Sequence, residues 1–297
     1  MDLSIIIVSY NTKDLLRNCL NSVYDSLKGE EIEFEIIVVD NASSDGSVEV
    51  VKKDFPGVVV IENRENLGFS KANNQGIKIA KGRYVLLLNS DTIILDECIT
   101  KVYAFAKSKK EAGIIGCKVL NPDGSLQFSC YNAINLCTEV NFFVRTILKD
   151  TFDFIADYKY MRSWKHDKLK IVGAVSGCFM LIRRGIFDQV GLLDETFFMY
   201  YEDLEFCERL KEQTKFNVYY FPEAEIKHLK GASIANDKSL VLTYKSARIF
   251  FNKRKKEKLF VTLCRIFWTI ELFVLLIFVF NNDVRRKLRT IRTLYAS

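Results

Sequence analysis

"LLLNSDT", residues 86–92, is an apolar run that ends on two short polar residues and an aspartate. The side chains of residues 85–88 suit the centre of a buried sheet, yet Asn89, Ser90 and Asp91 follow them where a plain turn would be enough. In α/β sheets, ligands bind beyond the carboxyl ends of the strands. Asp91 therefore either holds a divalent cation there or caps a helix in the "IILDECITKVYAFA" that comes next.

Strands alternate with helices before this run. "LSIIIV", "FEIIVVD" and "GVVVIEN" are short, apolar and β-branched, as buried strands are. Three helices are expected after them: "TKDLLRNCLNSVYDSL" with Thr12 as N-cap, "SDGSVEVVKKDF" with a capping serine or aspartate, and "FSKANNQGIKIAKG" with Gly82 as a left-handed C-cap. The alternation predicts a parallel sheet covered on both faces, with Asp40 and Asp91 opening onto one cleft.

The pattern is less regular after residue 110. "AGIIGCKVLNPDGSLQ" predicts a short strand and a Pro-Asp-Gly turn, whereas residues 130–168 lack a clear period and are expected to be mobile or to face an acceptor. "GAVSGCFMLIRRGIFDQVG" predicts a turn, a strand and a helix. "YYEDLEFCERLKEQ" predicts another helix, and "NVYYFPEAEIKH" predicts a late strand.

The composition is that of a globular chain with a different carboxyl-terminal part. Of the 297 residues 49% are hydrophobic, so a sizeable core is expected. The eight cysteines form no C-x-x-C pair, His166 and His228 lie far from paired cysteines, and the start lacks a basic leader, so we expect a reduced, cytoplasmic protein without a zinc site. Residues 241–297 hold thirteen Lys/Arg and three Asp/Glu, a net of +10, which leaves −4 of the total +6 for residues 1–240.

The basic part contains a long apolar run, residues 259–280. Its 22 residues could span a bilayer, but Arg265 and Glu271 lie inside it and would be costly at the hydrocarbon centre. Basic flanks on both sides favour a helix that lies on an anionic membrane surface, with a spanning or dimer-forming helix as the alternatives. A nucleic-acid-binding patch fits poorly beside so many Phe and Leu residues, so no nucleic-acid partner is expected.

Acidic side chains and one histidine are the candidates for chemistry. Asp40 either accepts hydrogen bonds from a nucleotide base or ribose, or merely ends a strand before a capped helix. The chain has no G-x-G-x-x-G or P-loop motif, so phosphates would need a metal. Glu202 and Asp203 either enrich a first helical turn in acids or supply a general base, and His228 is either structural or a metal ligand.

Six blocks, in order, resemble family 2 glycosyltransferases: "IIIVSYNTKDLLRNCLNSV", "IIVVDNASSDGSVEVV", "ENLGFSKANNQGI", "VLLLNSDT", "GAVSGCFMLIRRGIFDQVGLLDETFFMYYEDLEFCERL" and "HLKGAS". The resemblance covers about residues 3–235 and is nearest to the rhamnosyltransferase-like branch. It implies an α/β fold of the GT-A type, Rossmann-like with a mixed central sheet, over residues 1–240. It also implies inverting sugar transfer from a nucleotide-sugar. The basic charge and the apolar run predict a helical membrane-associating extension over residues 241–297.

The resemblance also implies roles for individual residues. Asn89-Ser90-Asp91 stands at the family's D-x-D motif with asparagine in its first position, so Asp91 and His228 would bind Mg²⁺ or Mn²⁺, and Asp203 would be the catalytic base. The implied donor-binding residues are Val8, Ser9, Tyr10, Asp40, Asn89, Ser90 and Asp91. The implied residues around the acceptor and the donor sugar are Gly173, Ser176, Gly177 and Glu202.

These roles set the expected partners. The donor would be dTDP-rhamnose, or else UDP-galactofuranose or UDP-N-acetylglucosamine. The acceptor would be a growing surface glycan or a polyprenyl-linked sugar at the inner face of the plasma membrane, and a homo-oligomer is possible. A membrane-bound partner that keeps the fold without turnover is the alternative from another functional class.

Overall fold

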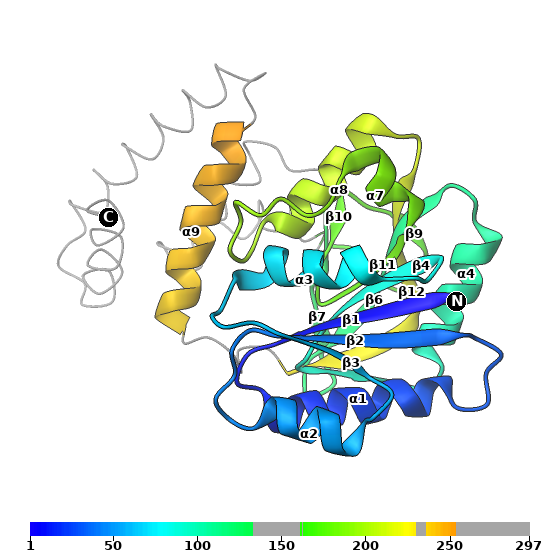
Figure 1. Cartoon of the computed structure of the whole chain (residues 1–297). Helices are drawn as coiled ribbons and strands as arrows, with labels where there is room; N and C mark the ends of the chain where they lie inside the picture. Colours follow the sequence, from blue (N-terminus) through cyan, green and yellow to red (C-terminus); the bar gives the residue numbers. More distant parts are fainter. Residues whose placement is uncertain (133–160, 162, 230–235, 254–297) are drawn as a thin grey trace.

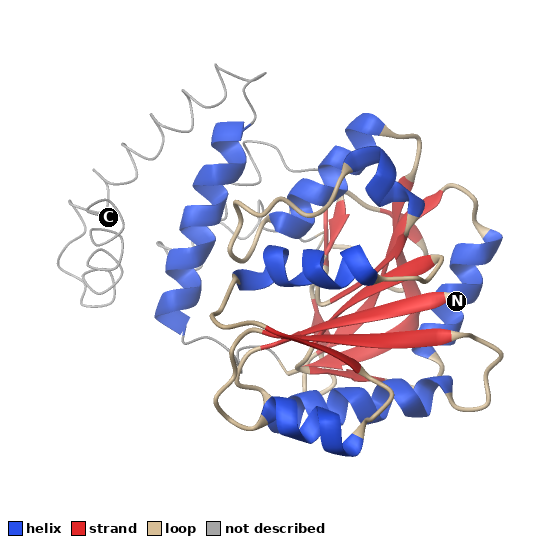
Figure 2. Cartoon of the chain, in the orientation of Figure 1, coloured by secondary structure: helices blue, strands red, loops and turns tan. Residues whose placement is uncertain are grey.

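The computed structural model describes residues 1–132, 161, 163–229 and 236–253. Its core is one ten-stranded sheet with the strand order β3-β2-β1-β4-β11-β6-β12-β5, in which β7 also pairs with β6 and β9 with β12. Helices cover both faces of this sheet (Figure 1; Figure 2). The mixed α/β sheet that the resemblance implied is therefore present.

The four strands predicted from the first ninety residues are all present. They are β1 (Leu3–Ser9), β2 (Phe34–Asp40), β3 (Val59–Glu62) and β4 (Tyr84–Asn89), and they run parallel to one another. Ser9 pairs in register with Asp40, and Val8 pairs with Asn89. The polar residues that end these strands therefore share one edge of the sheet, which lies on the side where α9 is drawn (Figure 1).

The other half of the sheet is mixed. The strand β11 (Phe179–Arg183) is antiparallel to both β4 and β6 (Ala112–Leu120). The long strand β12 (Asn217–His228) is parallel to β6 but antiparallel to β5 (Thr92–Ile94), with His228 in register with Thr92. This last pairing brings the end of β12 next to Asp91. The shorter strands are β7 (Leu126–Gln127), β8 (Cys130–Tyr131), β9 (Lys170–Ile171) and β10 (Ala174–Val175), with β8 and β10 forming a separate pair.

The helices pack on the sheet in two layers. One layer holds α1 (Lys13–Leu27), α2 (Ser47–Asp54) and α4 (Cys98–Ser108), and the other holds α3 (Gly68–Ile79), α7 (Gly185–Val190), α8 (Glu202–Gln213) and α9 (Asn236–Lys253). Within "LLLNSDT" the alternating side chains divide between the layers: Leu86 and Leu88 pack with α1 and α4, and Leu87 packs with α3 and α8. The run is continuously apolar because the strand is buried on both faces.

One predicted helix cap is right in position but not in its side-chain bond, and another is wrong. Thr12 precedes α1, but its side chain makes no cap bond; its hydroxyl lies 3.0 Å from the hydroxyls of Ser9 and Ser90. The carboxylate of Asp45 accepts the Lys13 N–H at 2.8 Å instead. The sequence pattern identified a polar residue at the right position, and a tertiary contact then took its hydroxyl.

The C-cap predicted at Gly82 is the second of these. Helix α3 ends at Ile79 with Ala80 in an extended conformation, and Gly82 is outside the left-handed region. A Cβ at Gly82 would lie 2.4 Å from the backbone nitrogen of Ser4. Glycine is required here because two backbone segments approach closely, and not because the chain turns left-handed.

The structure bears on some of the other expectations, whereas others concern residues that it does not describe. The six cysteines within the described residues are all buried and free, consistent with small core side chains. The expected boundary at residue 240 falls inside α9, whose Phe250 and Phe251 are buried in the core. Most of residues 130–168 and all of residues 259–280 lie outside the described residues. No helix within the described ranges is both long and apolar enough to cross a bilayer.

Candidate functional site

The carboxyl ends of β1, β2 and β4 place several polar side chains at one edge of the sheet. Ser9 and Asp40 are buried, at 0% and 3% exposure, whereas the neighbouring Tyr10 is 37% exposed. An exposed aromatic ring beside a buried carboxylate suits a planar base, which can stack on the ring and donate to the acid. Ser9 thus pairs in register with Asp40, with Val8 and Tyr10 on either side of it in the chain.

One oxygen of Asp40 has no protein partner. Its Oδ2 accepts the Ser43 N–H at 2.8 Å, which closes the loop after β2. The other oxygen, Oδ1, is buried and receives no hydrogen bond from any of the residues that the structure describes. Leaving a buried carboxylate oxygen without a donor costs free energy, so the geometry is suited to a ligand that brings an N–H or O–H.

A group of side-chain amides holds the loops next to Asp40. The Nδ2 of Asn63 donates to Asn41 and to Gln75, each at 2.9 Å, and the Nδ2 of Asn41 donates to the carbonyl of Gly68 at 3.2 Å. These bonds tie the loop after β2 to the loop before α3. The sequence analysis missed them, because scattered asparagines in loops carry no pattern that says which of them meet.

The polar residues of "LLLNSDT" meet the end of β12. Asp91 does not cap a helix, since β5 follows it directly and α4 begins later, at Cys98. Its Oδ1 lies 3.1 Å from Nε2 of His228, and Nδ2 of Asn89 lies 3.3 Å from the same nitrogen. Asp91 and His228 are 7% and 8% exposed. Ser90 faces away from this pair toward Thr12, where the two hydroxyls are bonded.

Gln127 determines which nitrogen of His228 carries a proton. Its Oε1 lies 2.6 Å from Nδ1 of His228, while its Nε2 donates to Asn121 at 2.8 Å and to the backbone carbonyl of His228 at 3.3 Å. The two acceptors orient the amide, so Oε1 can only accept from Nδ1–H. Nδ1 therefore carries a proton, and Nε2 faces both Asp91 and Asn89. No sequence signal indicated Gln127, which lies on a two-residue strand.

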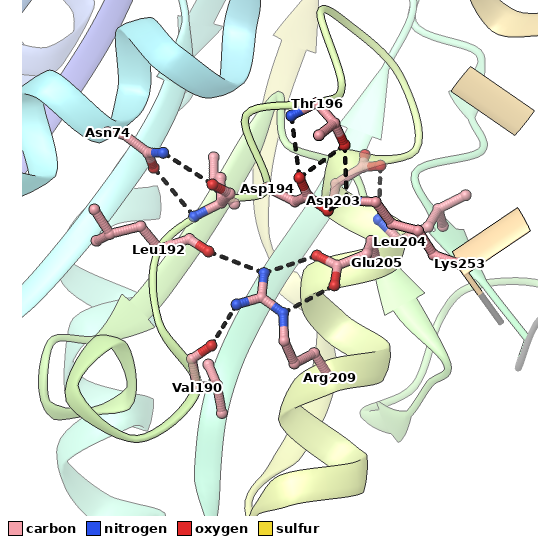
Figure 3. Close-up of polar contacts among 11 residues, drawn as sticks. Asn74, Val190, Leu192, Asp194, Thr196, Asp203, Leu204, Glu205, Arg209 and Lys253 are labelled. Atoms are coloured by element: carbon pink, nitrogen blue, oxygen red, sulfur yellow. Dashed lines mark hydrogen bonds and ion pairs between the residues drawn. The ribbon is translucent and has the colours of Figure 1, made fainter. Parts of the chain in front are cut away.

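Asp203 lies at the start of α8 and faces the loop before β11. Its Oδ2 accepts the Gly177 N–H at 3.0 Å. Its Oδ1 accepts the Leu204 N–H at 2.8 Å (Figure 3). The carbonyl of Cys178 accepts the Asn89 N–H at 3.1 Å. The loop that contains Gly177 and Cys178 therefore lies between Asp203 and the D-x-D-like triplet.

The remaining predicted residues take different places around this loop. The N–H of Gly173 donates to the carbonyl of Tyr131 at 2.7 Å, and the N–H of Ser176 donates to that of Ser129 at 2.8 Å. Glu202 is 5% exposed, and its Oε2 is buried without a hydrogen-bond partner. Burial, and then the neighbouring charge of Asp203, raise the pKa of Glu202 well above its usual value. Burial therefore favours the uncharged form of Glu202 beside the carboxyl group of Asp203.

His166 is the second histidine, and it takes no part in this edge. It is fully buried, its ring stacks on Trp164 at 4.4 Å, and Nδ1 lies 2.7 Å from the carbonyl of the same residue. His166 is therefore a core histidine that lies apart from the strand ends.

We compared the chain with models of known protein families. Residues 4–191, more than half of the chain, match the model of glycosyl transferase family 2. The chain belongs to glycosyl transferase family 2. The recognition made from the six sequence blocks is therefore confirmed, and the candidate site occupies the strand ends of a family 2 domain.

Known relatives of this family 2 chain act in different settings. An N-acetylglucosaminyl-diphospho-decaprenol L-rhamnosyltransferase of Mycobacterium tuberculosis is 28% identical over 269 residues, covering 85% of this chain and 84% of that protein. A poly(ribitol-phosphate) beta-glucosyltransferase of Bacillus spizizenii is 39% identical over 120 residues, which are 39% of this chain and only 19% of that protein.

A solved structure shares the fold of the family 2 chain. The crystal structure of S. aureus TarS 1–349 in complex with UDP-GlcNAc aligns with a TM-score of 0.53 and 17% identity, covering 84% of this chain and 65% of that one. At this identity the likeness shows the fold alone. It confirms the predicted GT-A fold, with parallel strands in one half of the sheet and mixed strands in the other.

Proposed function

We propose that this chain is an inverting glycosyltransferase that moves a sugar from a nucleoside diphosphate to a hydroxyl of a glycan or polyprenyl-linked acceptor. The observation that carries the proposal is the convergence at one sheet edge of three groups. A buried carboxylate oxygen of Asp40 lacks a donor, Asp91 faces His228 at 3.1 Å, and Asp203 lies across the Gly177 loop. In that order, they suit a nucleobase, a diphosphate and an acceptor hydroxyl.

Rhamnose from dTDP-rhamnose is the donor we favour. The mycobacterial relative, which this chain matches along most of both lengths, is named as an L-rhamnosyltransferase acting on a decaprenol-linked sugar. UDP-linked donors are the second candidate, since TarS was crystallised with UDP-GlcNAc and the Bacillus relative is named as a glucosyltransferase. In either case Asp40 and the backbone around Ser9 would hold the nucleoside.

Mg²⁺ or Mn²⁺ fits between Asp91 and His228. In a neutral imidazole whose Nδ1 proton is bound to Gln127, the Nε2 lone pair would oppose the Asp91 carboxylate oxygen that lies 3.1 Å away. A cation that both atoms ligate removes this opposition. When bound, it would neutralise the charge that develops on the leaving diphosphate. No three His, Cys, Asp or Glu side chains of the described residues cluster as a metal site, so oxygen ligands from the donor phosphates would complete the shell.

Asp203 would remove the proton from the acceptor hydroxyl. Backbone N–H groups of Gly177 and Leu204 hold its two oxygens, which fixes the direction of the carboxylate. Attack by the deprotonated hydroxyl on the side of the sugar opposite the diphosphate gives one displacement and hence inversion. Glu202, which is neutral and buried, would offer its unpartnered Oε2 to a sugar hydroxyl.

Thermal stabilisation by nucleoside diphosphates tests this proposal. dTDP, UDP and GDP are each added with Mn²⁺ and with a chelator, since a ligand that binds only the folded state raises Tm. We expect a metal-dependent rise for one nucleotide, with dTDP indicating rhamnose. If no nucleotide raises Tm in well-folded protein, the proposal fails in favour of a non-catalytic membrane partner. Hydrolysis of the matching nucleotide-sugar then separates an enzyme from a binding protein.

Gln127 should control metal affinity without touching the metal. Gln127→Leu removes the acceptor of the Nδ1 proton, so Mn²⁺ affinity with the nucleotide present is expected to fall about 10–100-fold. Gln127→Glu keeps an acceptor at Nδ1 and should restore part of this affinity. Calorimetric Mn²⁺ titration of both variants measures the effect independently of turnover. Equal affinity in the leucine variant and the parent would exclude this role.

We also propose that the basic tail binds anionic membrane, where a polyprenyl-linked acceptor would be found. The support is the charge of the sequence, a net of +10 over residues 241–297. Phe250 and Phe251 of α9 belong to the core. The tail should therefore be removed after Lys253, so that the whole of α9 is kept. The shortened chain is expected to lose most of its sedimentation with phosphatidylserine vesicles. Unchanged sedimentation would rule out the tail as the membrane contact.

A further inference from the structure

Residues 192–201, the segment that leads into Asp203, include an unusual stretch of backbone. Two successive aromatic residues, Tyr200 and Tyr201, lie in the left-handed region with φ of 68° and 71°. Bulky side chains are disfavoured there, and such a conformation persists only where the surroundings hold it. Asp203 follows two residues later, in the first turn of α8. The direction of its carboxylate therefore depends on what holds the two tyrosines.

Helix α9 contacts three successive residues of this segment. The hydroxyl of Ser246 donates to the carbonyl of Met199 at 2.7 Å, and the hydroxyl of Tyr200 lies 2.8 Å from that of Ser239. The ring of Tyr201 packs on Phe250, with 5.5 Å between centroids. Ser246 is only 3% exposed, so its bond to Met199 is shielded from water.

The earlier part of the segment is fastened by two other helices as well as α9. Asn74 of α3 binds both the carbonyl and the N–H of Leu193, at 2.8 and 3.1 Å, and Arg209 of α8 donates to the carbonyl of Leu192 at 2.9 Å (Figure 3). Lys253, at the end of α9, pairs with Asp194 (Figure 3). The segment is thus anchored from α3 and α8 where it begins, and from α9 where it approaches Asp203.

The same segment also contacts the donor side of the site. The carbonyl of Phe198 accepts the Phe69 N–H at 2.6 Å, in the first turn of α3. Gly68 has φ of +81°, and a Cβ there would lie 2.4 Å from that carbonyl. The carbonyl of Gly68 in turn accepts from Asn41, in the loop after Asp40. Movement of the segment would therefore disturb both Asp203 and the loop beside the nucleotide.

From these contacts we infer that α9 positions the catalytic base, with Ser239 and Ser246 acting through the Met199–Tyr201 backbone. The inference rests on the proposed function in one respect, that Asp203 is the base. Neither serine reaches the reacting atoms, so both are positioning residues. Because α9 continues in sequence into the basic tail, it links that tail to the base.

The test compares Tyr200→Phe, Ser246→Ala and the double variant with the parent, all as the full chain. Thr243→Ala is the matched control, because the Thr243 hydroxyl bonds only within α9, to the carbonyl of Ser239 at 2.8 Å. Two quantities are measured: kcat with donor KM, and hydrogen exchange of the peptides that contain Phe69 and Gly177. The second needs no turnover and reports whether the segment has loosened.

We expect the double variant to lose about tenfold in kcat, with a rise of about threefold in donor KM, and to exchange faster at Phe69 and Gly177. The control should match the parent in both respects. Unchanged exchange in the double variant overturns the inference, whether or not any sugar transfer is detected. Faster exchange with unchanged kcat overturns it too, and would mean that Asp203 is not the base.

Discussion

Asp203→Asn is expected to lower kcat by about 10²–10⁴-fold, the usual contribution of a general base. Asparagine has the same shape, and its oxygen can still accept the Gly177 N–H, which Asp203 accepts at 3.0 Å. The substitution therefore removes the basic carboxylate and keeps the hydrogen bond between residue 203 and the loop that contains Gly177. The Tm increase caused by Mn²⁺ with the matching nucleoside diphosphate should stay as it is in the parent. Asp203 lies on α8, whereas the donor-binding groups lie at the ends of β1, β2 and β4.

A matched control for this variant is Glu212→Gln, which neutralises an exposed acid on the same helix. It changes the net charge equally and should leave kcat within about twofold, because an exposed charge far along α8 is screened by solvent. If Asp203→Asn keeps kcat within a few-fold of the parent, Asp203 is not the base. If it loses nucleotide binding as well as turnover, its role lies in the donor site.

The first ninety residues were the most predictable part of the fold, because their signals are local. The first three strands there are short β-branched runs, and each is followed by a helix that leads to the next strand, so parallel pairing follows from handedness and connection length. That pairing alone predicts that Asp40 and Asp91 end at the same edge, and the register of β1 with β2 and β4 agrees. The answer to the question raised by "LLLNSDT" was therefore within reach of the sequence.

The partner of Asp91 was not within reach of the same reasoning. His228 comes 137 positions later and meets Asp91 because β12 lies antiparallel to β5, a pairing that no local pattern specifies. Only the resemblance to the family proposed the two as co-ligands. Gln127, from a third distant segment, was missed altogether. The helix caps at Thr12 and Gly82 failed for a related reason, since tertiary contacts with Ser90 and Ser4 decided both positions.

Replacing Asp91 should have the largest effect on donor binding. Asp91→Ala removes a ligand from a two-residue metal site, so the Mn²⁺-dependent part of the Tm increase with nucleoside diphosphate should disappear. Loss of metal stabilisation in the transition state is worth several kcal/mol, or about 10³-fold in kcat/KM. Glu97→Gln, an exposed acid six residues further along the chain, is the control and should keep both properties.

Asp91→Asn separates the metal site from an ordinary ion pair. When the proton on Nδ1, which Gln127 accepts, is the only one on His228, the lone pair of Nε2 faces a carboxylate oxygen of Asp91 at 3.1 Å. An asparagine amide could donate to that lone pair, so Tm without metal should stay equal or rise while the Mn²⁺-dependent increase is lost. Functional sites commonly hold such opposed groups at a cost in stability. A lower Tm without metal would mean that a proton bridges Asp91 and His228, and the pair would then be an ion pair rather than a metal site.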